Sequence, residues 1–212
     1  MRHAEVRYFD GVHPERLVLT EQGREQATAA AHALRDVRFD RVLTSGLERT
    51  LETARIVAPN VGPESCYALR EIESGDIREV APDEVQAMMT SAFRGVVALD
   101  TRFLGGETIG ELLDRVLPEV DRLLADRGWD IALLVLHGAV NRAVLSHALT
   151  GERVFLGAFE QEPGCINVLD VGPDGRWIVR GVNLLPYDPV HVQAPRLTTM
   201  EHLWQEYLNS RN

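Results

Sequence analysis

Apolar residues recur along the chain in two kinds of pattern, one typical of helices and one of strands. Ala27, Ala30, Ala31 and Leu34 follow the i, i+3, i+4, i+7 spacing of one helix face, which predicts a helix over 21–36. Thr20, directly before this stripe, has the side chain of a good N-terminal helix cap. The pattern therefore predicts one amphipathic helix early in the chain.

Short apolar runs predict the strands. "FDRVLTS" at 39–45 and "IALLVL" at 131–136 have strand length, and "CYALREI" at 66–72 predicts a strand that ends near Glu71. The segment "INVLDVGPDGRWIVRGV" alternates around Pro-Asp-Gly, which predicts a hairpin. Further helices are predicted at 46–58 with a Ser45–Glu48 capping box, at 83–93 after Pro82, at 108–127 with a kink at Pro118, at 139–149 and at 199–208.

Alternating strands and helices, with one strand apolar on both faces, favour an α/β fold. We expect a three-layer α/β/α sandwich around a mostly parallel sheet. The length of 212 residues suits a single domain over 1–212, with a helical insertion at about 80–106.

The charge balance limits the classes of partner. The formal net charge is -10, which argues against nucleic-acid binding, because nucleic-acid binders present a basic surface. All 22 basic residues are arginine, which excludes a Schiff-base lysine and a P-loop. Any anion site must therefore be built from arginine, histidine and backbone N–H groups.

Other global features point to an ordinary cytoplasmic protein. No apolar run approaches the ~20 residues that cross a bilayer, and we find no signal peptide in the sequence shown, so we expect no membrane partner. Cys66 and Cys165 alone do not form a disulfide framework, and we expect two reduced thiols.

Polar side chains fall at the ends of predicted strands. Arg2 and His3 precede the first helix, Arg49 follows the strand at 39–45, and His137 follows the strand at 131–136. Because ligands bind at the carboxyl ends of strands in open α/β sheets, these groups can converge on one phosphate. Taken singly, Arg49 is equally an exposed residue paired with a nearby glutamate, and His137 a hydrogen-bonded histidine that closes a strand.

Six segments in order resemble one known family, the histidine phosphatase superfamily with its RHG motif, whose members are phosphoglycerate mutase-like. The resemblance covers roughly residues 2–185. The segments are "RHAE" (2–5), "LTEQGREQA" (19–27), "VLTSGLERTLETA" (42–54), "LREIESGDIRE" (69–79), "GGETIGELLDR" (105–115) and "VLHGAVNRAVL" (135–145).

The resemblance implies a role for each candidate residue. His3 would be the nucleophile that forms a phosphohistidine, and Glu71 the general acid and then base. Arg2, Arg49 and His137 would bind the non-bridging phosphoryl oxygens, and the backbone N–H groups of Gly138 or Ala139 would add donors. No metal and no cofactor is implied.

Some positions depart from the family pattern. Ala4 replaces the motif's glycine, and Phe9 replaces an asparagine that often binds phosphate, so Arg7 or His13 are candidates to compensate. Members carry a strand before the motif, whereas only Met1 precedes it here. We expect either that the sequence as given begins inside that strand, or that the strand is lost or re-formed from other residues.

Three functions follow from these observations. The leading hypothesis is a phosphatase acting on a small phosphomonoester, and the partner would be a small phosphorylated metabolite. A phosphoglycerate mutase is the alternative within the family, although the short 80–104 region favours the phosphatase. A non-catalytic phosphate-binding module is the alternative from another class.

The sequence leaves open whether the protein forms a homodimer. Arg142 is a candidate for the site entrance, but an arginine is common there in the family, which favours a structural role.

Overall fold

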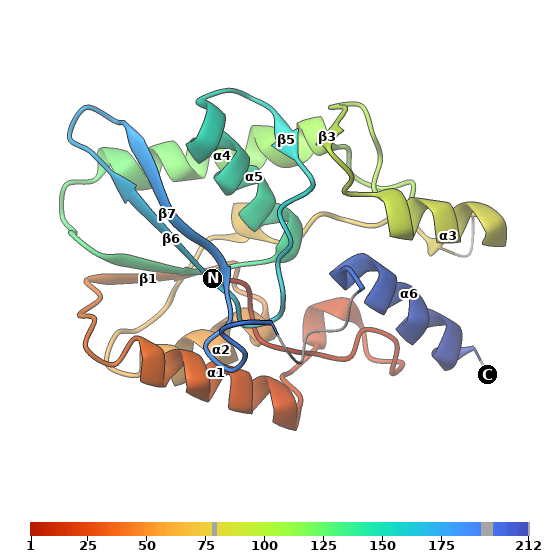
Figure 1. Cartoon of the computed structure of the whole chain (residues 1–212), viewed down its shortest axis with the longest axis horizontal. Coiled ribbons are helices and arrows are strands. Elements are labelled where there is room, and N and C mark those ends of the chain that lie inside the picture. The colour runs from red at the N-terminus through yellow and green to blue at the C-terminus, as the bar shows by residue number, and fades with distance from the viewer. Residues whose placement is uncertain (78–79, 192–196, 212) are drawn as a thin grey trace.

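A parallel sheet lies at the centre of the computed structural model, between two pairs of helices (Figure 1). The structure describes residues 1–77, 80–191 and 197–211. The strand order is β2 (Glu64–Ser65), β1 (Arg41–Thr44), β4 (Ala132–Val135), and both pairings are parallel. This arrangement brings the residues after β1 and after β4 to the same edge of the sheet.

The first three residues extend this sheet beyond β4. Arg2 forms a parallel bridge with Leu136, and the His3 N–H donates to the Leu136 carbonyl at 2.9 Å. On its other side the Arg2 N–H donates to the Cys165 carbonyl at 3.1 Å. The amino-terminal segment is therefore wedged between the end of β4 and the start of the β-hairpin, which fixes Arg2 and His3 at the sheet edge.

Two antiparallel pairs complete the strands. β6 (Ile166–Val171) and β7 (Trp177–Leu184) form the predicted hairpin around Pro-Asp-Gly. β3 (Val96–Val97) pairs with β5 (Phe155–Leu156) away from the main sheet.

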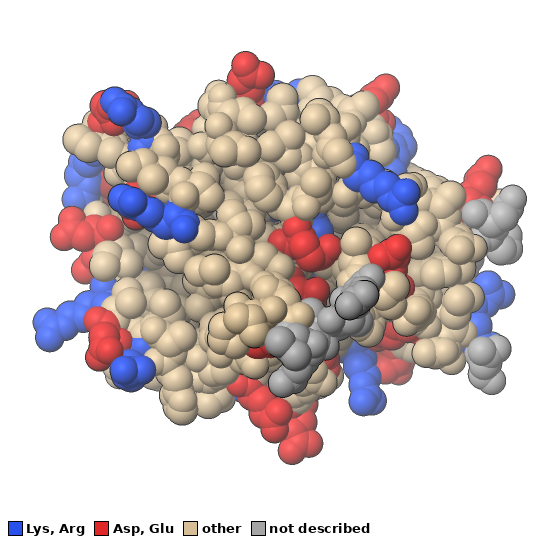
Figure 2. Space-filling model, viewed as in Figure 1, with Lys and Arg blue, Asp and Glu red and all other residues tan. Residues whose placement is uncertain are grey.

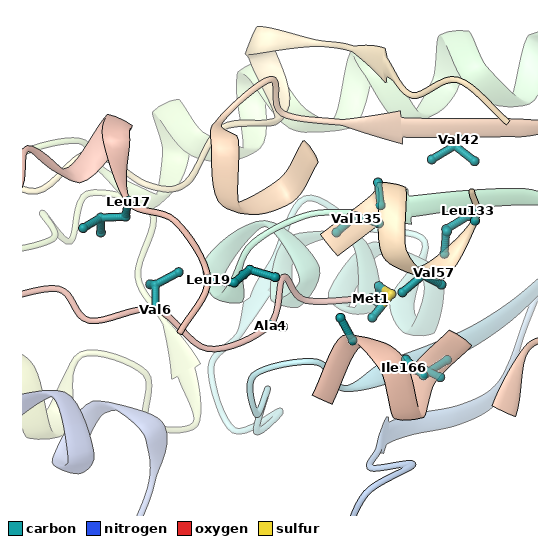
Figure 3. Close-up of a cluster of buried hydrophobic side chains, with 14 residues drawn as sticks. Met1, Ala4, Val6, Leu17, Leu19, Val42, Val57, Leu133, Val135 and Ile166 are labelled. Atoms are coloured by element: carbon teal, nitrogen blue, oxygen red, sulfur yellow. The ribbon is translucent and has the colours of Figure 1, made fainter. Parts of the chain in front are cut away.

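Two apolar cores cover the two faces of the sheet. On one face α1 (Glu21–Ala33) and α2 (Glu48–Val57) contribute side chains such as Ala30 and Val57, which pack with Val42 and Val135 of the sheet (Figure 3). On the other face α4 (Ile109–Ala125) and α5 (Gly138–Thr150) pack together around Leu112 and Val140. These layers confirm the predicted α/β/α fold with its parallel sheet.

A third, smaller cluster lies beside these cores. α3 (Pro82–Ser91) and the C-terminal helix α6 (Thr199–Ser210) enclose Val85, Met89 and Leu104, and Phe9 packs against the same group. Figure 1 shows α3 and α6 next to each other at one end of the molecule. No helix in the described part of the chain has both the length and the apolarity needed to cross a bilayer.

Most predicted helices are confirmed within a few residues, together with the Thr20 cap, whose side chain accepts from the Gly23 N–H, and Pro82 in the first turn of α3. α4 continues through Pro118, and the kink there remains a prediction. The capping box at 45–48 is wrong. α2 begins after Leu47, which makes no side-chain cap, and the Ser45 hydroxyl contacts Thr50 and His137 instead.

The strand predicted at 66–72 is also wrong. Only Glu64–Ser65 pair with β1, and a short 3-10 helix, η2 (Tyr67–Leu69), follows. The carbonyls of Ala68, Arg70 and Glu71 accept hydrogen bonds from the Arg115 guanidinium on α4. Because the partly buried Arg115 side chain satisfies these backbone groups, the segment needs no neighbouring strand and curves into a loop.

Candidate active site

His3 lies buried at the sheet edge with one ring nitrogen committed to the backbone. Its Nδ1 is 2.8 Å from the Ala4 carbonyl oxygen, an acceptor only, so Nδ1 carries the proton in this contact. The neutral tautomer then leaves Nε2 unprotonated. The side chain is only 1% exposed, and Nε2 lies 3.3 Å from the Tyr8 hydroxyl.

His137 comes to the same place from the end of β4, where it precedes α5. The ring centroids of His3 and His137 are 5.2 Å apart, at an interplanar angle of 66°. His137 Nε2 lies 2.7 Å from the Ser45 hydroxyl, at the end of β1. Its Nδ1 is buried and has no hydrogen-bond partner among the described residues. Two strand ends and the amino-terminal segment thus meet at one point.

Arg2 and Arg49 bring two guanidinium groups to the histidines. Each anchors one end on a carbonyl, Arg2 Nη1 on Gln161 at 2.6 Å and Arg49 Nη1 on Pro14 at 2.7 Å. In both, Nε is buried and has no partner in the described structure. Buried donors are normally satisfied, and guanidinium N–H groups match phosphate oxygens, so these atoms are suited to a bound phosphate.

The surroundings hold both imidazoles neutral. Burial lowers the pKa of His3 well below its usual 6.5, and the positive charges of Arg49 and Arg2 lower it further. The pKa of His137 is lowered well below 6.5 as well, first by burial and then by Arg49. A neutral ring has a free nitrogen lone pair, which is what a nucleophile requires.

Glu71 occupies the N-terminus of α5. Its Oε2 accepts from the Gly138 N–H at 2.9 Å, and its Oε1 accepts from the Ala139 N–H at 3.1 Å and the Ile72 N–H at 3.0 Å. The helix dipole and these free N–H groups favour an anion at this position. The backbone donors predicted to bind phosphate therefore hold the predicted general acid in this structure.

Arg115 fixes the loop that carries Glu71. Besides its bonds to three carbonyls of the loop, its Nε forms an ion pair with Glu107 at 2.6 Å. Glu107 in turn accepts from the Glu73 N–H and donates its own N–H to the Glu73 carbonyl. A Cβ at Gly106 would collide with that carbonyl, so glycine allows the close approach. The position of Glu71 is thus determined by α4 and the turn before it.

Arg142 borders the site next to Glu71. It is buried on α5, its guanidinium lies over the Phe93 ring at 4.8 Å, and its Nε donates to the Gly157 carbonyl at 3.1 Å. A Cβ built at Gly138 would lie 3.3 Å from Arg142 Nη1 and 3.5 Å from Glu71 Oε2. A third guanidinium group therefore borders the N-terminus of α5, beside Glu71.

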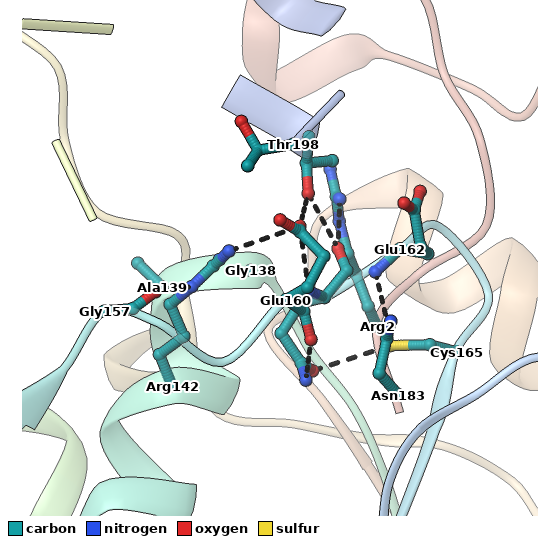
Figure 4. A network of polar contacts seen from close by, with 12 residues as sticks. Arg2, Gly138, Ala139, Arg142, Gly157, Glu160, Glu162, Cys165, Asn183 and Thr198 are labelled. Carbon is teal, nitrogen blue, oxygen red and sulfur yellow. Dashed lines mark hydrogen bonds and ion pairs between the residues drawn. The ribbon is translucent and has the colours of Figure 1, made fainter. Parts of the chain in front are cut away.

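Two carboxyl groups, those of Glu160 and Glu162, lie near Arg142 and Arg2. Glu160 is 3.4 Å from Arg142 Nη2 and accepts a hydrogen bond from Thr199 at the start of α6 (Figure 4). Partial burial raises the pKa of the nearby Glu162, and the charge of Glu160 raises it further. Acidic side chains gather around a hollow near the middle of the face shown in Figure 2. The rim of the site thus combines cations inside with acids outside.

The two candidates to compensate for Phe9 both lie at the surface. Arg7 and His13 are both exposed. His13 caps the short 3-10 helix η1 (Pro14–Arg16), and Arg7 lines a shallow surface cavity with Arg24. Within the described ranges, no group of three or more His, Cys, Asp or Glu side chains is placed to hold a metal ion.

From the sequence, neither Ser45 nor Arg115 was expected to take part in the site, and no hydrogen bond was expected of Tyr8. Ser45 contacts His137, Arg115 holds the Glu71 loop, and the Tyr8 hydroxyl lies 3.3 Å from His3 Nε2. Ser45 lies at the end of a predicted strand, as His137 does, and Arg115 is the last residue of the "GGETIGELLDR" segment. These positions could have indicated that both residues lie near the site.

Comparisons with known proteins identify the family of the chain. The family profile described as histidine phosphatase superfamily (branch 1) matches residues 1–184. Phosphoglycerate mutase-like protein 4 of Arabidopsis thaliana is 28% identical over 142 residues, which are 64% of this chain and 62% of that protein. Glucosyl-3-phosphoglycerate phosphatase of Mycolicibacterium vanbaalenii is 33% identical over 165 residues, covering 71% of this chain and 72% of that protein.

A solved structure supports the fold. The mycobacterial glucosyl-3-phosphoglycerate phosphatase in complex with inorganic phosphate superposes with a TM-score of 0.70 at 23% identity, over 87% of this chain and 95% of that one. This chain spans less than two thirds of the first curated relatives that it matches, 62% and 63% of their lengths. The relatives are named as phosphatases and as mutases, and the extent of the profile match shows that the chain belongs to the histidine phosphatase superfamily, branch 1.

Proposed function

We propose that the protein is a phosphatase that hydrolyses a small phosphomonoester through a phosphohistidine on His3 Nε2. One observation carries this proposal: two neutral imidazoles lie 5.2 Å apart, next to two buried arginines whose Nε atoms have no partner in the described structure. Phosphoryl transfer spreads negative charge over three oxygens, and preorganised cationic donors are its main requirement.

In the first step His3 Nε2 attacks the phosphorus atom. The bond from phosphorus to the ester oxygen breaks, and Glu71 gives its proton to that oxygen, so the alcohol leaves neutral. Arg2, Arg49 and His137 bind the non-bridging oxygens. The proton stays on Nδ1 and donates to the Ala4 carbonyl, which stabilises the positive charge that develops on the ring. This step requires the protonated form of Glu71, whose carboxyl oxygens accept from three backbone N–H groups in this structure.

In the second step water completes the reaction. Glu71, now a carboxylate, takes a proton from water while the hydroxide oxygen bonds to phosphorus. The bond from phosphorus to Nε2 breaks, and inorganic phosphate leaves. Glu71 is again protonated and His3 is again neutral. The same two residues thus begin and end the cycle in the same state.

The rim of the site favours hydrolysis over the mutase reaction. A mutase of this family holds a bisphosphate, so it needs cations for a second phosphate next to the first. Here Glu160 and Glu162 lie beside Arg2 and Arg142 (Figure 4). Carboxylates at this place repel a second anionic group, which supports a substrate with one phosphate.

The proposed function is tested by labelling with a ³²P-phosphomonoester. We expect an acid-labile label on the wild-type protein and none on His3→Ala, whereas His13→Ala, an exposed histidine, keeps the label. A parallel screen of phosphomonoesters with and without a chelator measures phosphate release, which we expect to be the same in both. Absence of label with every ester would favour a phosphate-binding module, and conversion of 3-phosphoglycerate to 2-phosphoglycerate would favour a mutase.

A further inference from the structure

We propose that Tyr8 is a further catalytic residue, whose hydroxyl donates a hydrogen bond to a phosphoryl oxygen during transfer to His3. This inference rests on the proposed function, because it concerns the same reaction. It gives a role in the reaction to the Tyr8 hydroxyl, which contacts His3 Nε2.

The first observation is the contact itself. The Tyr8 hydroxyl oxygen lies 3.3 Å from His3 Nε2, while His3 Nδ1 is occupied by the Ala4 carbonyl. Since Nε2 is then the unprotonated nitrogen, the hydroxyl is the donor. An attacking atom approaches its target to about 3–3.5 Å before reaction. The hydroxyl and the phosphorus atom therefore compete for the same side of Nε2, and the hydroxyl must move aside when the substrate enters.

The second observation is that this movement has to be small. The Tyr8 ring is packed against the core between the sheet and α1, and its backbone N–H donates to Glu206 Oε1 of α6 at 2.8 Å. The next residue, Phe9, packs on Tyr207 with ring centroids 5.3 Å apart. With the backbone held on both sides, a rotation of the side chain is the available movement, and it leaves the hydroxyl at the edge of the site.

The third observation concerns what the displaced hydroxyl meets. Arg2, whose Nε has no partner in the described residues, lies close enough to the Tyr8 side chain for Tyr8 to affect the pKa of Arg2. A phosphoryl group bound between Arg2 and Nε2 places an oxygen next to that hydroxyl. The Tyr8 O–H, which no longer donates to Nε2, then donates to this oxygen, where negative charge builds up in the transition state.

The test compares Tyr8→Phe with Tyr67→Phe, which removes the hydroxyl of an exposed tyrosine that contacts Arg70. Turnover of p-nitrophenyl phosphate, inhibition by orthovanadate, inhibition by inorganic phosphate and the melting temperature are measured for each. We expect Tyr8→Phe to lower kcat roughly 10²-fold, which is the effect of losing one hydrogen-bond donor to the oxyanion. Inhibition by vanadate should weaken more than inhibition by phosphate. Tyr67→Phe should match the wild type.

The other outcomes overturn the inference in distinct ways. If Tyr8 only blocks Nε2, Tyr8→Phe turns over faster and KM falls. If the hydroxyl is only structural, the melting temperature falls while kcat and both inhibition constants are unchanged. Labelling of the wild type separates this test from that of the proposed function: a labelled wild type with unchanged Tyr8→Phe kinetics refutes the role of Tyr8 alone, and an unlabelled wild type refutes both.

Discussion

At the scale of single residues, the site is defined by groups whose burial leaves them without ordinary partners. His3, His137, Arg2 and Arg49 are all at most 8% exposed. Arg2 Nε, Arg49 Nε and His137 Nδ1 have no hydrogen-bond partner in the described ranges. Three such nitrogen atoms around His3 destabilise the empty fold, and the two guanidinium groups favour an anion among them.

Removing one of these cations tests this interpretation. Arg49→Ala should lower kcat by roughly 10² to 10³, or about 3–4 kcal/mol of transition-state stabilisation, because one donor to the phosphoryl oxygens is lost. Steady-state kinetics measure the effect. Arg55→Ala, on the exposed side of the same helix and paired with Glu48, is the matched control and should be nearly neutral. Near-normal turnover of Arg49→Ala would remove this residue from the site.

The buried histidines also make stability depend on pH. In the unfolded chain they bind a proton below about pH 6.5, whereas their pKa values in the folded protein lie well below that. The unfolded state therefore binds more protons in this interval, and stability falls as the pH drops below 6.5. Urea unfolding at pH 7.5 and pH 5.5 measures the loss.

Variants show whether this loss comes from the site. We expect a smaller loss of stability between the two pH values in His137→Gln. His32→Gln, which changes an exposed histidine, should keep the wild-type loss. Equal pH dependence in all three proteins would contradict the assignment.

The sequence predicted the members of the site better than their partners. Arg2, His3, Arg49, Glu71 and His137 were found because each follows a strand end or stands in an ordered motif. The contact between Ser45 and His137 joins residues 92 positions apart, and a local pattern favours the capping role that Ser45 does not have. The burial of Arg142 likewise depends on Phe93 and Gly157, which no spacing relates to it.

At the scale of elements, the loop after η2 depends on a helix distant in sequence. Arg115 on α4 holds three successive parts of that loop, and Glu107 holds Arg115. The apolar pattern at 66–72 predicted a strand. Hydrogen bonds from the Arg115 side chain to the backbone carbonyls of this segment leave no pattern in the sequence, so the loop could not be predicted. Helices such as α1, α5 and α6 were predicted well because their caps and apolar stripes are local.

This clamp gives a prediction that depends on the leaving group. Arg115→Ala should displace Glu71, so kcat should fall more for an alkyl phosphate, whose alcohol needs a proton, than for p-nitrophenyl phosphate, whose leaving group does not. We expect roughly a tenfold difference between the two losses, within the 10²–10⁴ range of general acid catalysis. The comparison uses kcat for both esters. Arg122→Ala, an exposed arginine on α4 paired with Glu119, should show no such difference, and equal losses for both esters in Arg115→Ala would argue against a positioning role.

At the scale of the whole molecule, three apolar clusters hold different elements together. The two larger ones hold the sheet between its helices, and the smaller one joins α3 and α6 next to Phe9. Because Tyr8 bonds to Glu206 and Thr199 to Glu160, α6 contacts the segments that frame the site. The smaller cluster was out of reach of the sequence, since α3 and α6 are separated by more than a hundred residues.

Weakening that cluster should loosen one end of the molecule first. Met89→Ala removes a fully buried side chain and should cost about 2–5 kcal/mol. Hydrogen exchange should rise in α3 and α6 and stay low in α4 and α5. Val96→Ala, at a position 72% exposed, is the control and should change neither. Uniform loss of protection across all helices would show that the cluster is part of one cooperative core.

The wedge formed by residues 1–3 has a consequence for how the protein is made. Arg2 bonds to the carbonyl of Gln161, 159 residues later, and Arg2 and His3 bond to the backbone at Cys165 and Leu136. A ribosome adding about 5–20 residues per second needs on the order of ten seconds to travel that far. During this interval the nascent chain carries His3 without the residues that bury it, so the candidate site is completed only after the chain beyond residue 165 has emerged.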